Sequence, residues 1–174
     1  MLDLDVLIDE ETIHRRIDEL ALEITNDYGS EEVICICILK GSFPFTWELS
    51  KRIHKNNITF EFMEISSYEN AFESSGKLNI KKDISSNIQG KNILIIEDIV
   101  DTGCTLNYLS EYFKAKSPKS LKIATLLDKP SRRTTDVKVD YIGFTIEDKF
   151  VLGFGLDLEQ NYRNLPYIAY VKNC

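Results

Sequence analysis

The sequence predicts an α/β fold, with a mainly parallel central sheet flanked by helices. Stretches with strand character alternate along the chain with stretches of helical periodicity, the order that βαβ units produce. The strand candidates are short apolar runs rich in β-branched residues, as in VICICILKG at residues 33–41. Such runs are typical of strands buried on both faces of a sheet. With 174 residues, 43% of them hydrophobic, the chain is expected to form one domain over residues 1–174.

The first helix is predicted to begin at Asp9, a suitable N-cap, and its apolar residues recur at helical spacing up to Ile24. Gly29 is expected to end it. A polar stretch over residues 66–82 is expected to form a long loop that passes into a hairpin. The other expected elements are helices over residues 44–53 and 107–114, a strand from residue 92 that ends in an acidic pair, and strands over 58–66, 121–127, 141–146 and 167–171.

The charge balance excludes some classes of partner. The net charge is −7, whereas non-specific nucleic-acid binding needs clustered Lys and Arg. The apolar runs are too short to span a bilayer, and the acidic amino terminus does not resemble a secretory signal. Cys35 and Cys37 would point the same way from one strand, so a disulfide between them is not expected. We therefore expect a cytoplasmic protein with reduced thiols, which binds neither nucleic acid nor membrane.

Ligands of open α/β sheets bind beyond the carboxyl ends of the strands. The most informative of these ends is IIEDIVDTGCT at residues 95–105. Unpaired carboxylates are costly to bury, so Glu97 and Asp98 are expected at the mouth of the sheet. The turn over residues 101–105 combines hydroxyls, a glycine and a helix start, which together favour an anion. An anion site beside two carboxylates suits a phosphorylated sugar.

This run resembles the phosphoribosyl-pyrophosphate motif of type I phosphoribosyltransferases. The resemblance implies the fold of that family, with a small hood subdomain and a mobile lid loop over the sheet. It implies that Glu97 and Asp98 hold the ribose hydroxyls and that the turn binds the 5-phosphate through Asp101, Thr102, Gly103, Cys104 and Thr105. Many relatives carry lysine or another residue in place of Cys104, but the turn acts through backbone N–H groups, so the side chain should matter little. The chain has no GxxxxGK[ST] or GxGxxG motif.

Further positions resemble the hypoxanthine–guanine subgroup. Lys40 and Gly41 correspond to a pyrophosphate loop that often contains a non-proline cis peptide. Ser67 and Tyr68 correspond to the mobile lid. Lys129 corresponds to the lysine that donates to O6 of the purine; a cation there would prefer a 6-oxo acceptor over a 6-amino donor.

Three positions nearer the carboxyl terminus complete the resemblance. Phe150 would stack on the base, and the backbone at Val151 would contact the purine edge. Arg163 would reach the pyrophosphate, where a guanidinium suits phosphate oxygens, and Arg133 is a less secure candidate for the same role.

The resemblance implies transfer of a phosphoribosyl group from phosphoribosyl pyrophosphate to a 6-oxopurine base. Magnesium is the expected cofactor, with Asp157 as the best ligand and Glu97 and Asp98 as further candidates. Asp101 is the expected general base, or proton partner, at purine N7. A homodimer or homotetramer is expected on the same ground.

Two alternatives remain open at this stage. A regulatory protein of the same fold could sense phosphoribosyl pyrophosphate and bind nucleic acid, although this chain has neither an added domain nor a basic balance. An enzyme of the same fold could instead use xanthine or a pyrimidine. The residues around Leu156, Asp157 and Leu158 are expected to contact C2 of the base, where hypoxanthine, guanine and xanthine differ.

Overall fold

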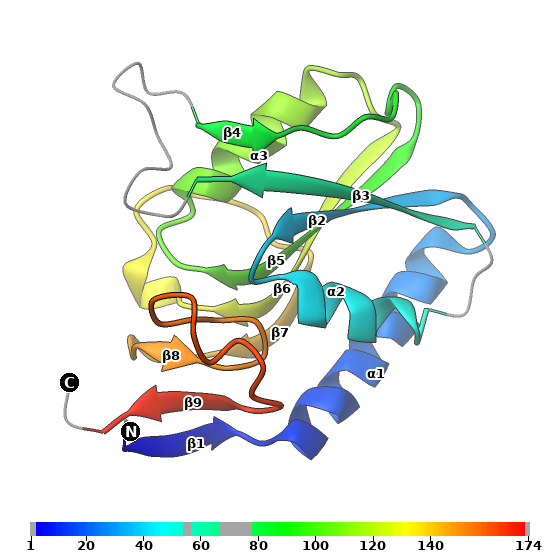
Figure 1. Ribbon diagram of the computed structural model, residues 1–174. Helices are drawn as coiled ribbons and strands as arrows, with labels where there is room; N and C mark the ends of the chain where they lie inside the picture. Colours follow the sequence, from blue (N-terminus) through cyan, green and yellow to red (C-terminus); the bar gives the residue numbers. More distant parts are fainter. Residues whose placement is uncertain (1–2, 54–56, 67–77, 173–174) are drawn as a thin grey trace.

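The computed structural model describes residues 3–53, 57–66 and 78–172. A six-stranded sheet with the order β4-β3-β2-β5-β6-β7 forms the centre, and a three-stranded sheet with the order β1-β9-β8 lies below it (Figure 1). The strands are β1 (Leu4–Ile8), β2 (Val33–Leu39), β3 (Ile58–Ile65), β4 (Ile80–Lys82), β5 (Asn92–Val100), β6 (Ser120–Asp128), β7 (Tyr141–Thr145), β8 (Val151–Leu152) and β9 (Ile168–Val171). The helices are α1 (Glu10–Tyr28), α2 (Phe43–Ser50), α3 (Cys104–Lys114) and the 3-10 helix η2 (Pro130–Arg132).

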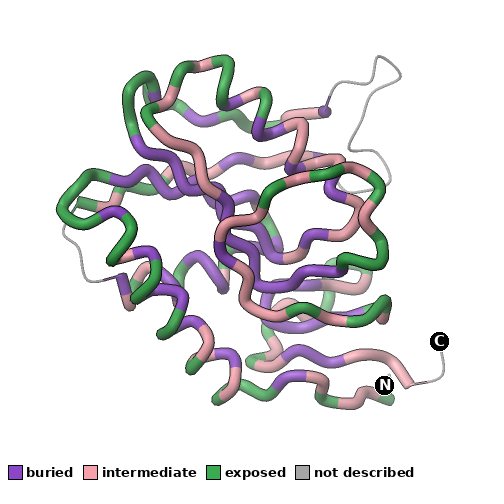
Figure 2. Tube along the Cα trace, turned by 180° about the vertical axis from the view of Figure 1, so that it is seen from behind, coloured by how far each residue is buried: buried purple, intermediate pink, exposed green. Residues whose placement is uncertain are grey.

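All pairings within the larger sheet are parallel except the one between β3 and β4. The mainly parallel α/β fold predicted from the sequence is therefore confirmed. Successive side chains of a strand point to opposite faces, so β5 contributes to two cores. Leu94 and Ile96 pack with α1 and α2, whereas Ile93 and Ile95 pack with α3. Burial on both faces explains why these strands are continuous apolar runs (Figure 2).

The amino-terminal helix follows its predicted limits closely. The Asp9 carboxylate accepts a hydrogen bond from Thr12 N at 2.7 Å, and Gly29, with φ of +53°, ends the helix. The Arg16 guanidinium donates to the carbonyl oxygens of Ile142 and Gly143 at 2.9 and 3.1 Å, which fastens α1 to β7. In the described part of the chain, no helix is long and apolar enough to cross a membrane.

The small sheet brings the two ends of the chain together, and it occupies the place of the expected hood. β1 pairs with β9 in antiparallel fashion, and Lys172 N donates to Asp3 O at 3.0 Å (Figure 1). The sequence predicted the strand β9, but it did not predict β1 or β8. Each of these two is short and acquires strand geometry from a partner distant in sequence. α3 begins at Cys104, within residues 101–105, where the sequence indicated a helix start, and it ends at Lys114 as predicted.

Candidate active site at the carboxyl edge of the sheet

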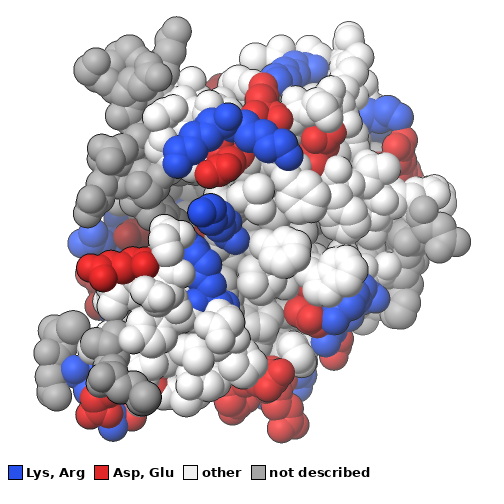
Figure 3. Space-filling view, in the orientation of Figure 1, with Lys and Arg blue, Asp and Glu red and all other residues white. Residues whose placement is uncertain are grey.

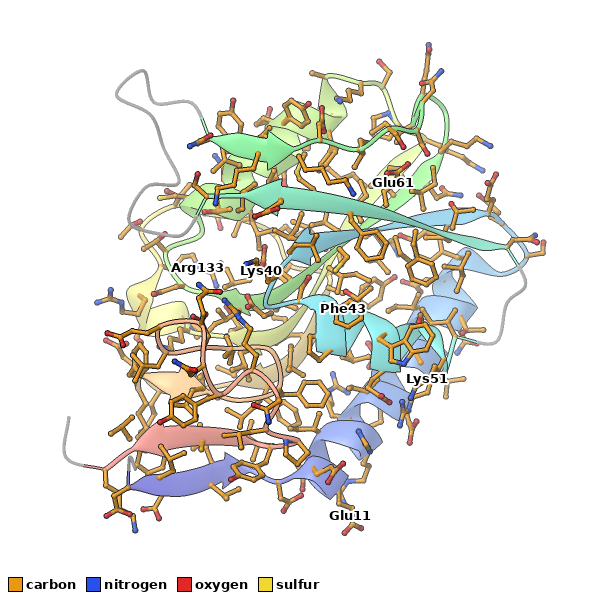
Figure 4. All side chains as sticks on the ribbon, viewed as in Figure 1. Glu11, Lys40, Phe43, Lys51, Glu61 and Arg133 are labelled. Atoms are coloured by element: carbon orange, nitrogen blue, oxygen red, sulfur yellow. The ribbon has the colours of Figure 1, made fainter. Side chains whose placement is uncertain are left out.

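A cavity of about 220 Å³ opens where β2, β3 and β5 end. Figure 3 shows Lys and Arg side chains gathered on this face between the larger sheet and the small sheet below it. Figure 4 shows Lys40 and Arg133 at this edge; Lys40 directly follows β2, and Arg133 directly follows η2. Of the residues singled out from the sequence, the cavity is lined by Lys40, Gly41, Glu97, Asp98, Asp101, Thr102, Gly103, Thr105, Asp157 and Arg163.

The loop after β2 passes directly against the acidic pair. The Leu39–Lys40 peptide bond is cis, as the resemblance implied. A Cβ added at Gly41 would lie 1.6 Å from Asp98 Oδ2 and 2.7 Å from its Cγ. Only a residue without a side chain can therefore bring the backbone of this loop so close to the carboxylate.

Glu97 and Asp98 are placed differently from the sequence expectation. β5 continues through both residues to Val100, because β6 keeps pairing with it as far as Asp128. Both carboxylates are buried while they line the cavity, so they lie within the strand and not beyond its end. Burial, reinforced by the neighbouring Asp98 charge, raises the pKa of Glu97 well above its usual value, and burial also raises the pKa of Asp98. In the free protein this pair favours binding a proton, a cation or a hydroxyl donor.

The raised pKa makes stability depend on pH. Above the ordinary Glu pKa of 4.5, the unfolded chain releases the Glu97 proton while the folded protein retains it, so stability falls as the pH rises. We expect Glu97→Gln to raise the free energy of unfolding by about 1–2 kcal/mol at pH 8 and to change it little near pH 4. Denaturant unfolding of the unliganded parent and variant at pH 4 and pH 8 measures this difference in the free energy of unfolding. A Gln variant that is less stable than the parent at pH 8 would contradict it.

The turn between β5 and α3 has the geometry of an anion site. Gly103, the N-cap residue of α3, has a φ of +85° and no side chain to cap the helix, and the first helical N–H, that of Cys104, makes only a long hydrogen bond of 3.4 Å to the Thr102 hydroxyl. The first N–H groups of an uncapped helix attract an anion, and the helix dipole adds to this. A Cβ at Gly103 would lie 2.5 Å from Thr135 O, so glycine is needed both for the conformation and for the space.

The segment after β6, residues 129–135, packs against this turn and hydrogen-bonds to it. Thr134 N and Thr135 N both donate to Thr102 O, at 3.0 and 3.1 Å. Cys104 Sγ lies 3.2 Å from the Thr135 hydroxyl, and hydrogen bonds from Thr135, Thr102 and Thr134 lower the pKa of the Cys104 thiol. The side chain of Arg133 packs over Gly103 and forms an ion pair with Asp128. Residues 128–135 are called the buttress below.

Arg163 connects the small-sheet side of the cavity to the loop after β2. Its Nη1 donates to Gly155 O at 2.7 Å, and its Nη2 lies 2.7 Å from Asp157 Oδ1. A Cβ at Gly155 would lie 1.9 Å from Gly41 O, so the two loops are in close contact. Among the described residues, the Nε groups of Arg163 and Arg133 are buried without a hydrogen-bond partner. Arg163 lines the cavity, where an anion would complete the hydrogen bonds of its guanidinium, whereas Arg133 is not part of the lining.

Three residues expected to contact a base, Lys129, Phe150 and Val151, are not part of the cavity lining, whereas Asp101 is. Lys129 is buried at the end of β6, where its Nζ donates to Lys149 O at 2.6 Å and lies 3.7 Å from Asp148 Oδ1. Phe150 is 51% exposed, so its ring is free to stack on a ligand, and Val151 is buried in β8. Cys104 is likewise absent from the lining. Ser67 and Tyr68 lie outside the described residues.

Comparison with known proteins identifies the family of the chain. Residues 5–159 match the family described as phosphoribosyl transferase domain. The chain belongs to this family. It is 48% identical over 167 residues to a hypoxanthine-guanine phosphoribosyltransferase of Bacillus subtilis, a match that covers 96% of this chain and 92% of the relative.

Solved structures agree. A hypoxanthine-guanine phosphoribosyltransferase from Bacillus anthracis matches with a TM-score of 0.92 and 46% identity, covering 99% of this chain and 100% of the other. A hypoxanthine phosphoribosyltransferase from Staphylococcus aureus matches with a TM-score of 0.91 and 45% identity, covering 98% and 92%.

Three carboxylates of this phosphoribosyltransferase could hold magnesium. Glu97, Asp98 and Asp157 all line the cavity and offer the oxygen ligands that magnesium prefers. Among the described residues, no three His, Cys, Asp or Glu side chains are close enough together to form a ready metal cluster. The carboxylates therefore fit magnesium as partial ligands, with substrate oxygens completing the shell.

Several cavity residues of this phosphoribosyltransferase were missed by sequence reasoning. They are Glu64, Lys81 and Gln160. Lys81 lies in β4 and pairs with Glu64 of β3, 3.8 Å away. The regular pairing of an expected hairpin could not have indicated this neighbour, because Glu64 pairs with Lys82 and Ile65 with Ile80, which leaves Lys81 as the extra residue of an irregular register. Gln160 N donates to Asp157 Oδ2 at 2.8 Å from a turn that has no distinct sequence signature.

Proposed function

We propose that the protein is a purine-salvage enzyme that transfers the 5-phosphoribosyl group from phosphoribosyl pyrophosphate to hypoxanthine or guanine. The products are the purine nucleotide, inosine or guanosine monophosphate, and pyrophosphate. The observation that carries this proposal is one cavity that combines the start of α3, whose N-cap Gly103 has no capping side chain, with two buried carboxylates and the cations Lys40 and Arg163. The names of its relatives, hypoxanthine-guanine phosphoribosyltransferases, support the choice of base.

Each part of the substrate has a matching part of the cavity. The start of α3 would hold the 5-phosphate, and Glu97 and Asp98 would accept hydrogen bonds from the ribose hydroxyls. Lys40 and Arg163 would neutralise the pyrophosphate as the bond to the anomeric carbon breaks. Bound magnesium, with Asp157 as its main protein ligand, would add positive charge on the pyrophosphate oxygens.

The base would enter between Phe150 and Asp101. Lys129 would donate to O6. A 6-amino group cannot accept such a hydrogen bond, so adenine would place a donor against the buried Lys129 ammonium. Asp101 would exchange the proton at N7 as the new bond forms at the other ring nitrogen of the five-membered ring.

The test is turnover with a panel of bases. Purified protein with phosphoribosyl pyrophosphate and magnesium is expected to convert hypoxanthine and guanine, but neither adenine nor uracil. Omitting magnesium, or adding a chelator, is expected to abolish the reaction. Tight phosphoribosyl-pyrophosphate binding without turnover of any base would instead favour a regulatory protein, and turnover of xanthine or uracil alone would change the base class.

Lys129→Gln tests the assignment of the base site. Loss of a hydrogen bond from a charged donor is expected to lower kcat/KM for hypoxanthine about 10- to 30-fold. The KM for phosphoribosyl pyrophosphate should stay within about twofold, because Lys129 does not line that cavity. Lys114→Gln, which alters an exposed α3 lysine paired with Glu111, is the matched control. An equal loss of kcat/KM for hypoxanthine and for phosphoribosyl pyrophosphate would show that Lys129 does not belong to the base site.

A homodimer or homotetramer is part of the proposal. Phe43 and Trp47 on α2 and Phe60 on β3 are large apolar side chains that remain exposed, and Figure 4 shows Phe43 on the near face of α2. Exposed aromatic side chains of this kind are typical of contact surfaces. Sedimentation of the purified protein measures the state. The cytoplasmic location expected from the sequence stays a prediction.

A further inference from the structure

Arg132 occupies a position between the two groups that are assigned to the purine. It ends η2, and its Nε lies 3.2 Å from Asp101 Oδ1 while its Nη1 lies 3.7 Å from Asp148 Oδ2. The other oxygen of Asp148 lies 3.7 Å from Lys129 Nζ. Four side chains of alternating charge therefore run from Asp101 through Arg132 and Asp148 to Lys129. This row is called the charge bridge below.

We propose that Arg132 is a positioning residue for the 6-oxopurine, a role that rests on the proposed function. It fixes the Asp101 carboxylate relative to the Lys129 ammonium. O6 and N7 lie on the same edge of a 6-oxopurine, so the lysine that donates to O6 and the carboxylate at N7 must be held at one separation. The charge bridge spans the two groups and sets that separation.

The backbone around Arg132 supports the same role. Arg132 N donates to Lys129 O at 3.1 Å, so the arginine and the lysine belong to one tight turn. Pro130 opens this turn and restricts its backbone. Lys129 N also donates to Val100 O at 2.9 Å, next to Asp101. Lys129 and Asp101 are thus connected twice, once through the backbone and once through the charge bridge.

The contacts of Lys129 leave it able to serve a ligand. Its ammonium has three donors, one of which goes to Lys149 O. The two remaining hydrogens can be shared between Asp148 and an incoming O6. Because Asp148 also contacts Arg132, loss of the arginine frees the carboxylate to hold Lys129 more tightly and away from the base. Removal of Arg132 therefore affects both ends of the bridge.

The bridge contributes little to folding. The side chains of Arg132 and Asp148 are 50% and 52% exposed, and ion pairs with this exposure add little to stability. Replacing Arg132 should consequently leave the fold intact, so a loss of activity can be traced to the site.

The experiment compares Arg132→Met, Asp148→Asn and the double variant with the parent enzyme. Hypoxanthine is varied at saturating phosphoribosyl pyrophosphate, and phosphoribosyl pyrophosphate is then varied at saturating hypoxanthine. Arg132→Met is expected to lower kcat/KM for hypoxanthine about tenfold, the size of one charge-assisted hydrogen bond. The KM for phosphoribosyl pyrophosphate should stay within about twofold. The double variant should lose no more than the worse single variant, because both substitutions break one bridge. Lys114→Met is the control for loss of an exposed cation.

The outcomes separate this inference from the function on which it rests. A parent enzyme that converts no base refutes the proposed function. If the parent is active, an Arg132→Met variant with unchanged kcat/KM for hypoxanthine overturns the inference. Additive losses in the double variant, or an equal rise in KM for both substrates, overturn it as well.

Discussion

Asp101→Asn is expected to lower kcat about 10²- to 10⁴-fold, the range for loss of a general acid–base group. The amide keeps the shape of the carboxylate but cannot accept the purine proton at neutral pH. Asp101 lines the cavity beside Thr102 and Gly103 and forms an ion pair with Arg132. Its position between the sugar site and the base site is what the role requires.

Binding must be measured separately from turnover in this variant. Calorimetric titration with phosphoribosyl pyrophosphate and magnesium should give an affinity within a few-fold of the parent, since the proposed phosphate site in the turn would act mainly through backbone N–H groups. Glu111→Gln, an exposed acid in α3, should behave as the parent in both measurements. If Asp101→Asn keeps nearly full turnover while Glu97→Gln abolishes it, the proton-transfer role belongs to another residue.

Gly41→Ala is expected to be the most damaging single-methyl change at the site. The added Cβ would lie 1.6 Å from Asp98 Oδ2, so either the loop after β2 or the carboxylate must move. A displacement of about 1 Å in a positioning group can cost about 100-fold in rate. We expect at least that loss in kcat/KM for phosphoribosyl pyrophosphate, together with a loss of about 1–3 kcal/mol in the free energy of unfolding from overpacking.

Gly90→Ala provides the matched control. Gly90 has a φ of +69°, and a Cβ there would meet no atom within 4 Å. The alanine should cost about 1–2 kcal/mol of stability through its backbone conformation alone and leave activity unchanged. Steady-state kinetics and denaturant unfolding of both variants compare the two effects. A Gly41→Ala variant that is as active as Gly90→Ala would show that the loop and Asp98 can separate without consequence.

The parts of the fold that were predictable are those whose cause is local. β2 and β5 are apolar runs buried on both faces, and α1 carries its own cap at Asp9, so each could be recognised from neighbouring residues alone. β1 could not, because its hydrogen bonds come from β9 near the other end of the chain. The end of β5 was also misplaced, since continued pairing with β6 carries the strand through two acidic residues that would otherwise mark its end.

The candidate site shows the same division. The turn before α3 was predictable because its residues are consecutive and its chemistry is local. The charge bridge was not predictable. Arg132 and Asp148 have no distinctive neighbours in sequence, and their role follows only from their positions on either side of Lys129 in the fold. Gln160 was missed for the same reason: its backbone conformation, with a φ of +67°, brings it against Asp157.

The buttress has a thermodynamic consequence for how the two substrates affect each other. One short stretch of chain holds the lysine assigned to the base at one end and supports the phosphate turn through Thr134 and Thr135 at the other. Any ligand that rigidifies one end removes part of the ordering cost at the other, and such coupling is reciprocal by necessity. Sugar phosphate and base should therefore strengthen each other's binding by the same factor. A change at Thr134 or Thr135 that loosens the turn before α3 should for that reason also weaken binding of the base.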